Sequence, residues 1–172
     1  MARPHERRTM YSQVTIFGHP IHPMLIAYPI ALYTATLVAF IIAAARGDMF
    51  WFKVAVVANI GGVIMAAAAA LPGFIDWAVG IPSGMAAKGH GLRHMLLNVI
   101  ALVVFIINAV AHVGQWTSAH PDTGWGIILS LLGVLCTVGA GFFGWTMIQT
   151  DHVGIQLTPE QERLEPTRPG RA

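Results

Sequence analysis

The sequence predicts an all-α protein, a four-helix transmembrane bundle with both termini on the cytoplasmic side. The composition is 55% hydrophobic and 10% charged, whereas soluble domains carry about 25% charged residues. Four long apolar runs each approach the roughly 20 residues needed to cross the hydrocarbon core of a bilayer. Lys and Arg residues are concentrated on one side of these runs, which the positive-inside rule assigns to the cytoplasm.

The four expected spans cover residues 24–45, 52–71, 94–113 and 125–148. The first run, Met24 to Ala45, has 22 residues and no charge, which is longer than the apolar core of about 7 to 15 residues in a signal peptide. The second run is expected to end at Pro72, because proline interrupts helical hydrogen bonding. We find no internal repeat in the sequence.

The chain divides into a basic segment (residues 1–13), a membrane domain (14–156) and a tail (157–172) that is expected to be disordered, because it lacks apolar periodicity. With the termini inside, the inner segments hold eight of the ten Lys and Arg residues. This bias predicts an N-in/C-in multi-pass protein. The lipid bilayer is therefore the expected partner, and no aromatic-interleaved basic patch suggests nucleic acid.

Histidines gather at the predicted inner surface. Five of the eight lie at the ends of apolar runs: His19, His22, His90, His94 and His152. Imidazole is a common metal and haem ligand, so several at one bilayer depth indicate a site. His90 and His94 share a face only if helix already includes His90, which Gly89 and Gly91 disfavour. The connection from Pro72 to Arg93 is expected to be a long glycine-rich loop beside this site.

Other residues near this surface leave alternatives open. Gly154 permits a turn that folds His152 back toward the bundle. Asp76 could orient a ligand histidine through the second ring nitrogen of that histidine, or it could be a loop carboxylate that bonds backbone amides. His112 follows His94 by 18 residues, and would lie on the same stripe about 27 Å away. Because the outer side offers His112 only a loop partner, His120, we expect at most one haem, on the inner side.

Four blocks of sequence resemble the bacterial membrane family of domain of unknown function 2231: Gly18 to Ile30 with His19-Pro20-Ile21-His22-Pro23, then Gly73-Phe74-Ile75-Asp76-Trp77, His94 with Asn98, and Asp151-His152-Val153-Gly154-Ile155. The resemblance covers residues 14–156 and implies a four-helix domain of a bacterial inner (plasma) membrane, without an agreed activity. The closing block lacks the glycine that follows the histidine in the family pattern. Relatives joined to Rieske or c-type cytochrome domains imply electron transfer, although this chain has no Cys-x-x-Cys-His motif.

Three functions are compatible with these residues. In the first, a b-type haem electron-transfer domain, His19 or His22 pairs with His94 on one haem b, with His152 as a further candidate, and a redox partner protein or quinone exchanges electrons. In the second, a non-catalytic membrane scaffold or assembly subunit, the histidines form a hydrogen-bonded cap. In the third, a simple metal site, the ligands come from His19, His22, His90, His94 and Asp76. No catalytic triad or paired-carboxylate site is recognisable, so independent turnover is not expected.

Overall fold

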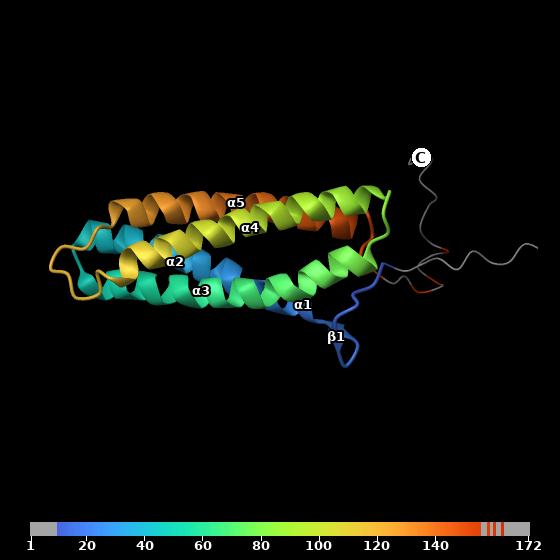
Figure 1. Cartoon of the computed structure of the whole chain (residues 1–172), viewed down its shortest axis with the longest axis horizontal. Helices are drawn as coiled ribbons and strands as arrows, with labels where there is room; N and C mark the ends of the chain where they lie inside the picture. The colour runs from blue at the N-terminus through green and yellow to red at the C-terminus, as the bar shows by residue number, and fades with distance from the viewer. Residues whose placement is uncertain (1–9, 156–157, 159, 161–162, 164–172) are drawn as a thin grey trace, which may run out of the picture.

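The computed structural model describes residues 10–155 together with residues 158, 160 and 163. Over this part of the chain, four long helices lie alternately antiparallel and form an elongated bundle (Figure 1). They are α2 (Ala27–Arg46), α3 (Met49–Ile75), α4 (Ala86–Val113) and α5 (Gly124–Gln149). Each is long and apolar enough to cross a membrane, which confirms the prediction of four apolar helices of spanning length. The side of the membrane that holds the termini stays a prediction.

A short hairpin leads into the first span. Strand β1 (Thr15–Ile16) pairs antiparallel with β2 (His19–Pro20), and the turn between them uses left-handed backbone at Phe17 and Gly18. One helical turn, α1 (Ile21–Leu25), then continues into α2. The segment His19-Pro20-Ile21-His22-Pro23 thus runs from a tight hairpin into a helix, and His22 lies on the helical part.

The second and third helices extend further than predicted at the end of the bundle where the linker between them lies. Helix α3 passes through Pro72 and continues into a π-helical turn, η1 (Asp76–Gly80), so the prediction that Pro72 ends the helix is wrong. Helices inside a bundle tolerate proline because neighbouring helices satisfy the freed backbone groups. Helix α4 already begins at Ala86 and includes His90. The expected long loop is therefore reduced to residues 81–85.

Each helix packs most closely against its neighbour in sequence. Helix α2 lies along α3 and α4 lies along α5, while contacts of α2 with α5 and of α3 with α4 close the ring. Helices α2 and α4 are therefore diagonal partners. At the centre, the rings of Tyr33 and Phe105 from these two helices stack with centroids 3.6 Å apart. A Cβ on Gly62 or Gly133 would lie 2.7 or 2.4 Å from these rings, so both positions need glycine.

The two hairpins, α2–α3 and α4–α5, repeat the same layers of side chains. Each position of the first span corresponds to the position 72 residues later in α4, and each position of α3 to the position 71 residues later in α5. Three ring layers follow this rule: His22 with His94, Tyr33 with Phe105, and Phe40 with His112. The glycines that receive the central rings, Gly62 and Gly133, follow it too.

Buried polar groups obey the same correspondence. Thr36 matches Asn108 and Asn59 matches Ser130, and all four side chains are fully buried. Asn108 donates to Ser130 Oγ at 2.9 Å. Because a hairpin returns to its starting side, the two hairpins have the same orientation and are related by a pseudo-two-fold axis along the bundle. No repeat was expected from the sequence, but the ring contacts between the hairpins follow one.

The start and end of the membrane domain meet. The amide of Gly154 donates to the carbonyl of Met10 at 2.8 Å. These segments, η1 and the linker between α3 and α4 all lie at the same end of the bundle, on the right in Figure 1.

Candidate metal centre

His22 and His94 face each other across the bundle axis. His22 lies in α1 and His94 in the third turn of α4, 72 residues later in the chain. Their ring centroids are 6.2 Å apart and their planes are nearly perpendicular, at 88°. Both side chains are half-buried at the end of the bundle that carries η1. The structure thus brings together two of the four histidines proposed for a haem.

Both rings are held by a backbone carbonyl of the neighbouring helix. Nδ1 of His22 lies 2.8 Å from the carbonyl oxygen of Ala69 on α3, and Nδ1 of His94 lies 2.8 Å from that of Ala140 on α5. A carbonyl only accepts, so Nδ1 carries the hydrogen and Nε2 of each neutral ring keeps its lone pair. A second ring nitrogen fixed in this way is the usual support of a metal-ligating histidine.

Each ring also lies against a glycine one turn beyond its carbonyl partner. A Cβ on Gly73 would lie 2.7 Å from Nδ1 of His22, and a Cβ on Gly144 would lie 3.2 Å from Nδ1 of His94. Ala69 and Gly73 on α3 therefore form the same socket as Ala140 and Gly144 on α5. The site is built twice, once by each hairpin.

The two halves of the site differ at one residue. Nδ2 of Asn98 donates to Nε2 of His94 at 3.1 Å and to the carbonyl of His94 at 3.0 Å. The equivalent position in the first hairpin is Ile26, and no described side chain bonds Nε2 of His22. Nε2 of His22 is therefore available to a ligand. Nε2 of His94 can bind a ligand only after its hydrogen bond from Asn98 is broken.

The ring separation suits one shared metal ion. A metal on a straight line between two Nε2 atoms, about 2.0 Å from each, would hold the imidazole centroids about 6 Å apart, and the centroids of these two rings are 6.2 Å apart. Among the described residues, no group of three or more His, Cys, Asp or Glu side chains could hold a metal. Two imidazoles are too few for a tetrahedral zinc site, whereas a haem would need no more than two imidazoles from the protein.

The remaining predicted ligands lie apart from this pair. His19 is exposed in β2 and His152 is exposed with left-handed backbone. His90 lies in α4, where its Nδ1 is 2.7 Å from Oδ2 of Asp151. This contact ties the start of α4 to the segment after α5. It gives His90 a structural partner of its own.

Asp76 anchors the N-terminal segment. Its carboxylate accepts hydrogen bonds from Ser12 Oγ at 2.7 Å and from the amides of Gln13 at 2.7 Å and Val14 at 3.2 Å. This is the backbone-bonding alternative that the sequence left open. With three donors already in place, Asp76 holds β1 against η1 and does not bond either paired histidine.

Lys88 closes the end of η1. Its ammonium donates to the carbonyl oxygens of Trp77, Ala78 at 3.2 Å and Ile81 at 3.1 Å. In return, Nε1 of Trp77 donates to the carbonyl of Lys88 at 3.0 Å. A cation at the carboxyl end of a helix stabilises the exposed carbonyl groups. Lys88 therefore fixes the linker beside the paired histidines.

A third intramembrane histidine lies at the opposite end of the core. His112 is 1% exposed and packs against Phe40, with its Nδ1 2.8 Å from the carbonyl of Asn108. Its Nε2 is buried without a hydrogen-bond partner. His112 corresponds to Phe40 in the first hairpin, and the two rings pack against each other in one layer. This layer is at the other end of the core from His22 and His94.

Sequence reasoning missed the supports of the pair. The carbonyl groups of Ala69 and Ala140 leave no signature, because every residue has one. The recurrence of Ala-x-x-x-Gly at residues 69–73 and 140–144, together with a histidine 72 positions after another, was the available signal.

Comparison with known proteins identifies one family. Residues 18–157 match the family described as predicted membrane protein (DUF2231). Neither a curated protein nor a solved structure matches the chain.

Proposed function

The chain belongs to the DUF2231 family of membrane proteins, and we propose that it is a membrane redox protein in which His22 and His94 hold one b-type haem. The observation that carries this proposal is the histidine pair: two carbonyl-anchored imidazoles on diagonal elements of the bundle, with ring centroids 6.2 Å apart. Bound haem would supply one-electron chemistry. A quinone or a redox protein would be its partner in the bacterial plasma membrane.

The protein's own contribution is orientation. Ala69 and Ala140 set the tautomer of each ring, and Gly73 and Gly144 let the rings approach the helix backbones. Neither the cavity between α2 and α5 nor the one between α2 and α3 borders His22 or His94. A porphyrin would therefore need more space around this pair than these cavities supply, whereas a bare ion would need little.

Optical spectroscopy tests the haem. After expression with ample haem supply, the purified protein should show Soret and α bands in its reduced-minus-oxidised spectrum. His22→Ala and His94→Ala should each abolish the low-spin spectrum, because bis-imidazole ligation needs both rings. His19→Ala and His152→Ala are the matched controls and should leave it unchanged.

Absence of these bands from the wild-type protein, with metal present in elemental analysis, would replace haem by a simple metal centre at the same pair. Loss of the bands in the His19 or His152 control would contradict the assigned ligands.

A structural role is the second candidate, and one observation favours it. The Nδ1 bonds of His22 and His94 tie α1 to α3 and α4 to α5, as a cap in a scaffold or assembly subunit would require. In that case the double variant His22→Ala, His94→Ala has a lower thermal stability than the wild-type protein. The wild-type protein then carries neither a chromophore nor stoichiometric metal. Intramembrane hydrogen bonds contribute about 0.6 kcal/mol on average, so the loss for two bonds would be near 1 kcal/mol.

A further inference from the structure

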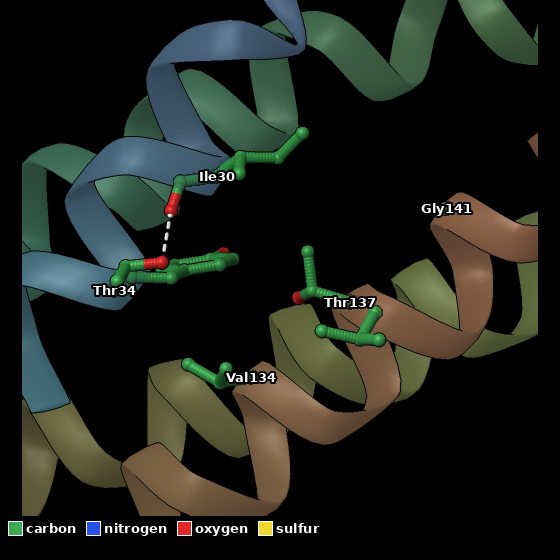
Figure 2. A pocket seen from close by; sticks show the side chains of 7 residues that line it. Ile30, Thr34, Val134, Thr137 and Gly141 are labelled. Carbon is green, nitrogen blue, oxygen red and sulfur yellow. Dashed lines mark hydrogen bonds between the residues drawn. The ribbon is translucent and has the colours of Figure 1, made fainter.

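A cavity of about 200 Å³ lies between α2 and α5, in the middle of the membrane-spanning part. Figure 2 shows Ile30 and Thr34 of α2 opposite Val134 and Thr137 of α5. Its outer walls reach the lipid-facing surface, since the side chains of Ile30 and Val138 are 47% and 66% exposed. Ligands therefore reach this cavity from the lipid phase.

One strong hydrogen-bond donor belongs to its wall. Tyr33 is 3% exposed, and its buried hydroxyl has no hydrogen-bond partner. The hydroxyls of Thr34 and Thr137 already donate to the carbonyls of Ile30 and Gly133 in their own helices. An unpaired buried hydroxyl costs free energy unless a partner arrives. The wall thus offers one free O–H donor and two hydroxyl oxygens that can accept.

The pseudo-symmetry shows that these hydroxyls are not required by the fold. At the equivalent positions of the other half, Tyr33, Thr34 and Thr137 correspond to Phe105, Ile106 and Ala66. The opposite groove, between α4 and α3, is therefore wholly apolar at these three positions. In the other half, the same packing layer forms without any of the three hydroxyl groups. These hydroxyl groups are therefore a feature of the α2–α5 side only.

We infer that this cavity binds the ring of a lipid-soluble quinone, with Tyr33 donating to a ring carbonyl. An engineered apolar cavity of about 150 Å³ holds benzene, so the space suits one six-membered ring whose isoprenoid tail lies in lipid. The cavity begins one turn from the haem candidate, because Gly141 of its wall precedes Gly144 by three residues. The choice of a quinone among carbonyl-bearing lipids rests on the proposed redox function.

Calorimetric titration with ubiquinone-1 in detergent micelles tests the inference. The wild-type protein should bind one equivalent saturably. Tyr33→Phe keeps the stacked ring and should raise Kd about threefold to tenfold, because one neutral hydrogen bond is lost. The triple variant Tyr33→Phe, Thr34→Ile and Thr137→Ala reproduces the opposite groove and should lose saturable binding.

Ile106→Thr is the matched control on the opposite side and should leave Kd unchanged. The inference is overturned if ubiquinone-1 does not saturate, if Tyr33→Phe binds as tightly as wild type, or if the control weakens binding equally. Titration of the His22→Ala, His94→Ala double variant separates the two proposals. If this double variant binds quinone and the wild-type protein contains no haem, the quinone cavity is supported and the haem proposal is contradicted.

Discussion

The first hairpin and the second hairpin build the same layers with different chemistry. Where the first places Ile26, Tyr33 and Phe40, the second places Asn98, Phe105 and His112. Among the positions that match in identity are two where backbone and ring touch, the pairs Gly62 with Gly133 and Gly73 with Gly144. The comparison separates what the fold needs from what each half adds.

This difference indicates where function is located. Shape is set by glycine sockets that accept one ring each, and it is shared by both halves. Polar groups that the fold does not require are unequally distributed: the hydroxyls of the cavity belong to one side, and the amide of Asn98 to the other. The buried polar pairs Thr36 with Asn108 and Asn59 with Ser130 differ in residue type, whereas the paired histidines are the same residue in both halves, which is what a site on the axis requires.

The largest effect should come from breaking a shared socket. Gly133→Ala places a Cβ 2.4 Å from Cε2 of Phe105 and so disturbs the stack with Tyr33. We expect the free energy of unfolding to fall by about 2 to 3 kcal/mol, because an overpacked core must shift. Denaturation in SDS mixed micelles measures it. Gly89→Ala has open space and should be neutral or slightly stabilising; equal losses in both variants would show that the socket is not the cause.

An intermediate effect of opposite sign should come from making the halves more alike. His112→Phe copies the residue of the first hairpin and removes a buried Nε2 that has no partner. We expect stability to rise by about 1 kcal/mol, since the desolvation cost of the unpaired nitrogen exceeds the lost Nδ1 bond. The same denaturation assay applies, with exposed His120→Phe as control. A destabilised variant would mean that Nε2 has a partner, such as a bound water.

The smallest effect should come from Asn98→Ile, which gives the second hairpin the residue of the first. Loss of the side-chain bonds to His94 should cost about 0.6 kcal/mol, the average for such bonds inside membranes. The haem spectrum should persist, because the carbonyl of Ala140 still orients the ring. Disappearance of the spectrum would instead make Asn98 a positioning residue for His94.

The sequence predicted the four spans because apolar length is a strong signal in membrane proteins. It misplaced the ends of the second and third helices beside η1 because proline usually interrupts a helix, whereas α3 continues through Pro72 inside the bundle. Gly89 and Gly91 were taken to weaken the start of α4, yet Gly91 is where Trp77 packs against that helix. Its tertiary contact outweighs its low helix propensity.

The candidate site was predictable in part. The positions of His22 and His94 at the ends of apolar runs indicated a common depth, and the structure pairs them. Nothing in the sequence separated them from His19 and His152, because exposure depends on how the β1–β2 hairpin and the turn after α5 fold. The partners of Asp76 lie more than 60 residues away and could not be inferred from local pattern.

Lys88 acts at two stages in the life of the chain. While the nascent polypeptide is being inserted, its charge belongs to the connection between the second and third spans and helps to retain that connection on one side. Once η1 has formed, the same ammonium is taken up by three main-chain carbonyls. The same charge thus serves first in membrane topology and then as a helix cap. Lys88→Gln should therefore affect both insertion of the chain and the stability of the folded bundle.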